Sequence, residues 1–187
     1  FIAPFVLDPN NQNIMYLAAG EYIWRNDGLS GIPLTNEFDT ISINWTQLPD
    51  TLITAGKVIT AISISTVPAH RLYYGTNRKN IYRLDNANTG TPVRTTITSN
   101  LFPASGYVSC IAVNPQNADE LMVVFSNYSV YSLWHSADGG TTWAKAGGNL
   151  EANVSGTGNG PSLRWASILP LQSGGTVYFA GGSTGLY

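Results

Sequence analysis

The stretch Ser136-Ala137-Asp138-Gly139-Gly140-Thr141-Thr142-Trp143 places serine, aspartate, glycine, threonine and tryptophan at the spacing S-x-D-x-G-x-T-W. The short side chains of Ser136 and Asp138 can accept hydrogen bonds from nearby backbone N–H groups, which holds a tight turn. Gly140 supplies backbone angles that other residues resist, and the ring of Trp143 can fold under the turn and cover the end of a hairpin. The stretch therefore predicts a turn between two strands, with structural roles for Ser136, Asp138, Gly140, Thr142 and Trp143.

The residues around this turn form a unit of four short predicted strands. An apolar segment at 110–113 leads to a turn at Pro115, and a second apolar segment follows at 121–125. A third strand, carrying an aromatic residue, is expected at 129–131, and a fourth at 143–146. The many β-branched and aromatic residues favour strands, and we find no convincing helical pattern.

The same order of apolar strand, proline turn and aromatic-rich strand occurs again along the chain. The turn prolines are Pro9, Pro68, Pro115 and Pro170, which recur at intervals of roughly 50 residues, as in propeller repeats. Four strands per unit, repeated radially, form a blade of a β-propeller. The sequence therefore predicts an all-β fold, a β-propeller of four-stranded blades of which about three and a half are present as part of a larger ring. The blades are expected at about 3–57, 58–107, 108–163 and, incomplete, 164–187.

The turn motif resembles the Asp-box, or bacterial neuraminidase repeat. This box occurs in sialidases, in xyloglucan-cleaving and related glycoside hydrolases, in sortilin-type receptors and in photosystem assembly factors. The match is complete in one unit, whereas the first unit keeps only Asn26-Asp27-Gly28 and Trp45, and the second only Asp85-Asn86 and Gly90. The resemblance implies a propeller in which the box lies in the outer part of a blade, away from the active site. Because the box occurs in proteins of several functions, it indicates a fold and not a reaction.

Composition excludes several classes of function. Only 11% of the 187 residues are charged and the formal net charge is -2, which argues against a nucleic-acid partner. No apolar run approaches the roughly 20 residues of a membrane span. The single cysteine, Cys110, rules out an intrachain disulfide and a cysteine-rich zinc site, and we predict neither a metal nor a cofactor. Abundant Asn and Thr with few Lys are typical of exported bacterial proteins, so we expect a secreted or cell-surface location.

Candidate ligand-binding residues lie in the loops expected at one end of the propeller channel, with two more at the start of an innermost strand. They are Arg78, Tyr107, Asn153, Arg164 and Trp165. A glycosidase needs two carboxylates flanking the scissile bond, and Asp50 and Glu151 are the best pair that the loops offer. The alternative is that both are solvated loop acids. A sialidase would need three arginines and a nucleophilic tyrosine, and no motif supports that arrangement around Arg78, Arg164 and Tyr107.

Three hypotheses of function follow from this pattern. The first is an extracellular propeller segment that binds a polysaccharide or a protein without a catalytic constellation of its own. The second is a fragment of a secreted glycoside hydrolase acting on a polysaccharide, and the third is a structural or assembly propeller. Because a partial ring exposes blade faces and an open strand edge, either self-association or further polypeptide is expected to close it.

Overall fold

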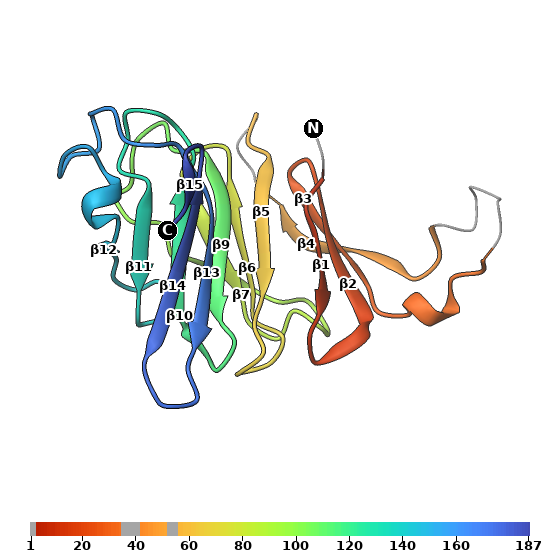
Figure 1. Cartoon of the computed structure of the whole chain (residues 1–187). Coiled ribbons are helices and arrows are strands. Elements are labelled where there is room, and N and C mark those ends of the chain that lie inside the picture. The colour runs from red at the N-terminus through yellow and green to blue at the C-terminus, as the bar shows by residue number, and fades with distance from the viewer. Residues whose placement is uncertain (1–2, 35–41, 52–55) are drawn as a thin grey trace.

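The computed structural model arranges the chain as four antiparallel β-sheets that follow one another in chain order (Figure 1). It describes residues 3–34, 42–51 and 56–187, and the side chains of residues 49–51 lie outside this description. The first sheet consists of β1 (Phe5–Asp8), β2 (Asn11–Ala19), β3 (Tyr22–Asn26) and β4 (Trp45–Thr51). The second consists of β5 (Ile59–Ile64), β6 (Leu72–Thr76), β7 (Ile81–Leu84) and β8 (Arg94–Thr96).

The last two sheets continue the series. The third consists of β9 (Val108–Asn114), β10 (Asn117–Phe125), β11 (Leu133–Ser136) and β12 (Ala144–Lys145). The fourth has three strands, β13 (Leu163–Pro170), β14 (Thr176–Gly182) and β15 (Gly185–Leu186). Two short 3-10 turns, η1 (Leu29–Gly31) and η3 (Gly148–Leu150), lie in the connections.

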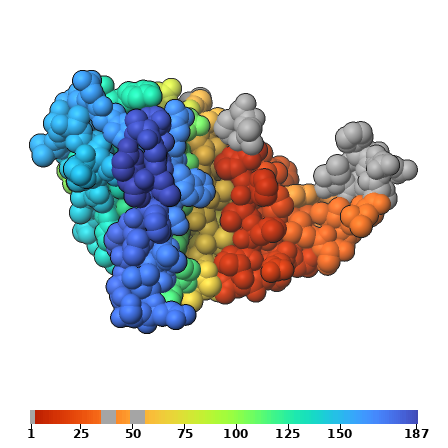
Figure 2. Space-filling view, in the orientation of Figure 1, coloured from red at the N-terminus to blue at the C-terminus, as the bar shows by residue number. Residues whose placement is uncertain are grey.

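Within each sheet the strands are neighbours in sequence order, and the first strands of successive sheets lie beside one another, with β9 between β5 and β13. Figure 2 shows the same order on the surface, where the colour changes from the red first sheet to the blue fourth sheet. The sheets do not close into a ring. The structure thus confirms the predicted all-β fold, a partial propeller. No helix in the described part of the chain is long and apolar enough to cross a membrane.

An apolar layer fills the interface between each pair of consecutive sheets, and we call each such interface a joint. In the first joint, Tyr16, Ala18 and Ile23 of the first sheet pack against Leu72 and Tyr74 of the second. The second joint is the most aromatic, with ring centroids of Phe102 5.1–5.4 Å from those of Phe125, Trp134 and Trp143. The third joint is built of smaller side chains, among them Cys110, Ala112, Ala166 and Ala180. Removal of these apolar surfaces from water is the main force that holds the sheets together.

The third unit differs from the prediction in the position of its third strand. That strand was expected at 129–131, but β11 occupies Leu133–Ser136. Ser129 has a positive φ of 59°, which interrupts an extended strand, and the N–H of Ser132 donates to a side chain, Oε1 of Glu151, at 2.7 Å. The strand therefore begins only after these residues. Also contrary to expectation, β4 extends to Thr51, so that the backbone of Asp50 belongs to a strand and not to a loop.

A polar cluster fastens the fourth sheet to the third. Glu120 of β10 accepts hydrogen bonds from the hydroxyl of Tyr178 in β14 and from Nδ2 of Asn114, and Nε2 of His135 lies 3.4 Å from its Oε1. Partial burial by itself would raise the pKa of Glu120, but these hydrogen bonds outweigh it, so that the pKa is lowered from its ordinary value. The ionised carboxylate is therefore the form that stabilises the joint.

Acid is expected to weaken this joint. Because the folded-state pKa of Glu120 lies below the unfolded one, its stabilisation is present above the ordinary glutamate pKa of about 4.3 and is lost as the pH falls through the folded value. Between about pH 5 and pH 3, the wild-type chain should lose about 1 kcal/mol more unfolding free energy than Glu120→Gln does. Urea denaturation of both proteins at several pH values measures this difference, and parallel pH profiles would contradict it.

Candidate functional site

The turns between the second and third strands of the sheets lie at one end of the molecule, together with the segments that enter β5, β9 and β13 (Figure 1). We call this end the loop face. It includes residues 20–21, 56–58, 77–80, 97–107, 126–132, 146–162 and 183–184. Loops held on a rigid scaffold are the usual carriers of binding function, so the loop face is the candidate site.

A repeated pair of hydrogen bonds fixes the backbone of the loop face. In the second sheet, Asn77 Oδ1 accepts the N–H of Val58 at 3.0 Å, and the N–H of Asn77 donates to the carbonyl of Val58 at 3.1 Å. In the third sheet, Asn127 Oδ1 accepts the N–H of Tyr107 at 2.5 Å, and the carbonyl of Tyr107 accepts the N–H of Ser126 at 3.1 Å.

The fourth sheet repeats this arrangement with serine. The N–H of Ser162 donates to Oγ of Ser183 at 3.3 Å, and the N–H of Ser183 donates to the carbonyl of Ser162 at 2.9 Å. The sequence does carry a sign of this repeated arrangement. A short polar residue, Asn77, Asn127 or Ser183, stands just after the second strand of each of these three sheets. These residues do not stand out in the sequence, because short polar residues are common throughout this chain.

Further hydrogen bonds join loops of different sheets. The N–H of Lys79 donates to the carbonyl of Gly106 at 2.6 Å, which links the second sheet to the segment entering the third. Oγ of Ser162 donates to the carbonyl of Ser126 at 2.7 Å, which links the fourth sheet to the third. These hydrogen bonds connect the loop face of the last three sheets into one surface. They fix the turns without a bound ligand.

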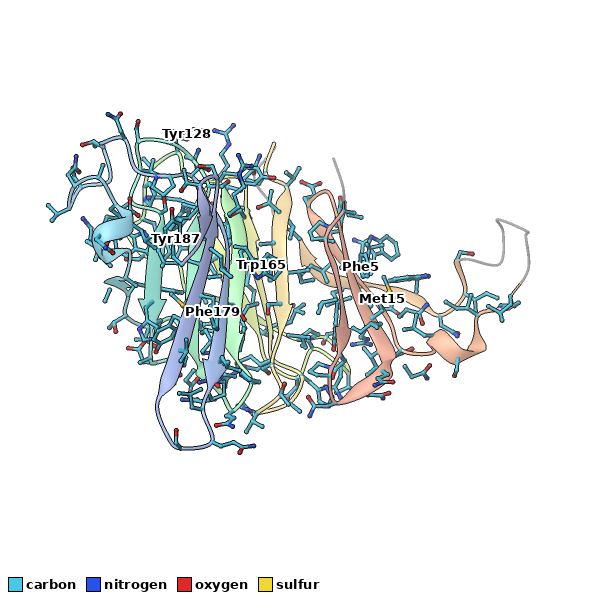
Figure 3. All side chains as sticks on the ribbon, viewed as in Figure 1. Phe5, Met15, Tyr128, Trp165, Phe179 and Tyr187 are labelled. Carbon is cyan, nitrogen blue, oxygen red and sulfur yellow. The ribbon has the colours of Figure 1, made fainter. Side chains whose placement is uncertain are left out.

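Two tyrosine side chains project from this connected surface. Tyr107 is 38% exposed and Tyr128 is 66% exposed, and Figure 3 shows Tyr128 at the end of the molecule where the loops gather. Arg78, which is also exposed, lies in the β6–β7 turn next to Lys79. Tyr107 and Arg78 were predicted site residues. Tyr128 was not predicted, because exposure of an aromatic side chain is decided by tertiary packing.

The other predicted binding residues have different positions. Asn153 orders its own loop, because its Oδ1 accepts the N–H groups of Ser155 at 3.0 Å and Thr157 at 3.2 Å. Arg164 and Trp165 are exposed near the start of β13. Trp165 lines a hollow of about 280 Å³ along the innermost strands together with Phe5 and Ile62.

The structure gives no distance between the two predicted carboxylates, Asp50 and Glu151. The side chain of Asp50 lies outside the described residues. Glu151 directly follows η3, and its Oε1 accepts the N–H of Ser132 that precedes β11. Burial raises the pKa of Glu151, and the hydrogen bonds to its carboxylate act in the opposite direction. Glu151 thus has a structural task in shaping the loop before β11.

The S-x-D-x-G-x-T-W turn joins β11 to β12, at the end of β11 opposite to the β10–β11 loop. Asp138 Oδ1 accepts hydrogen bonds from Oγ of Ser136 and from the N–H of Thr142, both at 2.8 Å, and Oδ2 accepts one from Oγ1 of Thr142 at 2.6 Å. The hydrogen bonds from Thr142 hold the pKa of Asp138 at about 2. The carboxylate is therefore ionised at neutral pH and accepts three hydrogen bonds from its own turn.

Gly140 and Trp143 complete this turn. Gly140 has a φ of +89°, and a Cβ atom there would lie 2.7 Å from Cβ of Ile97, so both backbone angle and space require glycine. Nε1 of Trp143 donates to the carbonyls of Ile97 at 2.9 Å and of Gly140 at 3.0 Å. The ring therefore ties the turn of the third sheet to the second sheet.

A scan against protein-family models and a search of curated proteins both find no match. Solved structures with a similar fold include a GH74 enzyme of Niastella koreensis, with a TM-score of 0.58 and 18% identity over 94% of this chain and 28% of that one. The GH74 xyloglucanase of Xanthomonas campestris has a TM-score of 0.56 and 17% identity, over 95% of this chain and 26% of that one. YCF48 of Cyanidioschyzon merolae has a TM-score of 0.55 and 14% identity, over 97% of this chain and 49% of that one. The chain thus spans between about a quarter and a half of these propeller proteins, with which it shares the fold.

Proposed function

We propose that this chain is part of an extracellular propeller that binds a glycan through its loop face. The observation that carries the proposal is the pair of exposed tyrosines, Tyr107 and Tyr128, on turns whose backbones are held by Asn127 and neighbouring loops. Loops rich in Tyr, Asn, Ser and Gly are characteristic of binding surfaces, because tyrosine offers a large contact area at low entropic cost.

The chemistry of the loop face suits a sugar polymer. A tyrosine ring has an apolar face against which the C–H face of a sugar can pack, and a hydroxyl that exchanges hydrogen bonds. Arg78 and Lys79 lie in a turn that is bonded to the segment before Tyr107 through the Lys79 N–H and the Gly106 carbonyl, and they add donors without making a strongly charged field. The xyloglucanase among the structurally similar proteins makes soluble xyloglucan a suitable first probe.

We expect Tyr107→Ala and Tyr128→Ala each to weaken xyloglucan binding at least tenfold, a loss of about 1.4 kcal/mol, because each removes an exposed aromatic contact. Isothermal titration calorimetry with xyloglucan oligosaccharides, and with a panel of other soluble glycans, measures the effect. Val93→Ala is the matched control, since Val93 is exposed in the β7–β8 connection at the opposite end, and it should bind as the wild type does.

Three results would count against the proposal. Glycan affinity that is unchanged in the double variant Tyr107→Ala/Tyr128→Ala would place the site elsewhere. Failure of every glycan at millimolar concentration would favour a protein ligand. Release of reducing sugar that disappears in Asp50→Asn or Glu151→Gln would favour a fragment of a secreted glycoside hydrolase.

A further inference from the structure

Three basic side chains of the loop face have no acidic partner in the described part of the chain. Elsewhere arginines pair with aspartates, as Arg71 does with Asp119 at 2.5 Å. Lys57, Arg78 and Lys79 form no ion pair with any described carboxylate. The whole chain holds 11 acidic and only 9 basic residues, so three unpaired cations on one surface stand out. We call these three residues the basic cluster.

One asparagine holds Lys57 beside the β6–β7 turn. Oδ1 of Asn77 accepts the N–H of Val58 at 3.0 Å, and Nδ2 of Asn77 donates to the carbonyl of Gly56 at 3.2 Å. Lys57 lies between these two bonded residues, and Arg78 directly follows Asn77. The segment that enters β5 and the β6–β7 turn therefore present their cations from adjacent stretches of backbone.

Lys79 occupies a backbone conformation that does not favour lysine. Its φ is +57°, in the left-handed region that few residues other than glycine adopt. In the corresponding turn of the first sheet, between β2 and β3, a glycine, Gly20, has a φ of +64°. Lysine offers no conformational advantage over glycine at such a position, and what it adds is a cationic side chain. Observed strain of this kind is a reason to look for a function.

The basic cluster adjoins one of the tyrosines of the proposed glycan site. The N–H of Lys79 donates to the carbonyl of Gly106 at 2.6 Å, and Tyr107 is the next residue. A sugar ring that packs against Tyr107 would bring its substituents close to the basic cluster. Hydroxyl groups would not compensate the charge of these cations, whereas a negatively charged substituent would.

We propose that the basic cluster binds an acidic group of the glycan, either the carboxylate of a uronic acid or a sulfate ester. This inference rests on the proposed function and names the class of glycan. The guanidinium of Arg78 can donate two parallel hydrogen bonds to either group, and the lysines add point charges. Three cations are too few for the extended basic surface that nucleic acids require.

Isothermal titration calorimetry with two acidic probes and their neutral forms tests this proposal. The probes are oligogalacturonate beside its full methyl ester, and a sulfated galactan oligosaccharide beside its desulfated form. The wild-type chain should bind one or both acidic probes about tenfold more tightly than the neutral form, and the probe that it prefers identifies the acidic group. Raising NaCl from about 50 to about 500 mM should weaken acidic binding about threefold or more and leave neutral binding unchanged, because salt screens exposed charges.

Removal of the basic cluster should abolish this preference. We expect the triple variant Lys57→Gln/Arg78→Gln/Lys79→Asn to bind acidic and neutral forms equally, with its neutral affinity unchanged. Asparagine is chosen at position 79 because it tolerates a positive φ. Arg78→Lys/Lys79→Arg retains the charges and should retain most of the preference. Should the triple variant fail to fold, as judged by circular dichroism, Arg78→Gln alters an exposed side chain and should lower the preference about threefold.

Arg94→Gln is the matched control for the change in net charge. Arg94 is at the start of β8, next to the end of β7 that lies away from the β6–β7 turn. Its loss removes one positive charge without altering the basic cluster, so the preference for acidic probes should persist.

Four results would overturn the proposal. Equal affinity of the wild type for acidic and neutral forms would remove the acidic group but leave glycan binding through the tyrosines intact. An acidic preference that survives in the triple variant would place that group elsewhere. Absence of binding by every acidic and neutral glycan would overturn the proposed function as well. Tighter binding of polyglutamate or duplex DNA than of any acidic glycan would assign the basic cluster to a different class of partner.

Discussion

Replacing Trp143 with alanine is expected to lower the free energy of unfolding by about 3–5 kcal/mol, the usual cost of removing a large aromatic side chain from a core. Trp143 is only 8% exposed. Its ring centroid lies 5.1 Å from that of Phe102, and its Nε1 donates to the carbonyl of Ile97, just after β8, and to that of Gly140 in its own turn. The substitution therefore opens a cavity in the joint between the second and third sheets and also leaves the Ile97 carbonyl without this donor.

Chemical denaturation followed by circular dichroism measures this loss. Trp143→Phe keeps most of the ring volume but removes the Nε1 donor, so its loss should be smaller, about 1–2 kcal/mol. Tyr128→Ala serves as the control, because truncation of an exposed ring is expected to change stability by less than about 0.5 kcal/mol. A loss below about 1 kcal/mol in Trp143→Ala would show that the turn is held in another way. Since domains are typically stable by about 5–15 kcal/mol, the expected loss is a large fraction of the total.

The second large effect is expected at Asp8, a completely buried carboxylate in the joint between the first and second sheets. Oδ2 of Asp8 lies 2.7 Å from Nδ1 of His70 in the second sheet's β5–β6 connection. Oδ1 accepts the N–H of Asn10 at 2.9 Å, and the buried hydroxyl of Tyr16 is 3.4 Å from Oδ2. Asp8→Ala removes the acceptor shared by these groups, so we expect a loss of about 3 kcal/mol.

Asp27→Ala is the matched control for this prediction. Asp27 also pairs with a basic side chain, Nη2 of Arg25 at 3.7 Å, but its own side chain is half exposed. Arg25 itself is buried, but a carboxylate that is half exposed and 3.7 Å from its partner contributes only about 0–1 kcal/mol, and salt weakens that contribution. Urea denaturation at low and high salt should therefore show a large, salt-insensitive loss for Asp8→Ala and a small one for Asp27→Ala. Equal losses in the two variants would contradict the role given to Asp8.

Much of the candidate site became visible only in the folded chain. Arg78 and Tyr107 could be predicted from the sequence, because the loops between predicted strands could be placed at the channel end. The sequence could not place Tyr128 on the exposed surface, nor could it show that the carboxylate of Glu151, one of the two candidate catalytic acids, accepts the N–H of Ser132. Those assignments depend on contacts between residues 19 or more positions apart, which local patterns do not encode.

The all-β class, the repeated unit and the turn at 136–143 were determined by the sequence alone. Their signals are local, because short polar side chains, Gly140 and alternating apolar residues act within a few positions of one another. Tertiary structure decided where β11 begins, which tyrosines reach solvent and which sheet sides remain uncovered. It did so through partners distant in sequence, such as Asp8 and His70, which lie 62 positions apart. Apolar residues of the same pattern are buried or exposed according to whether a neighbouring sheet covers them, and that depends on how the sheets are arranged in the folded chain.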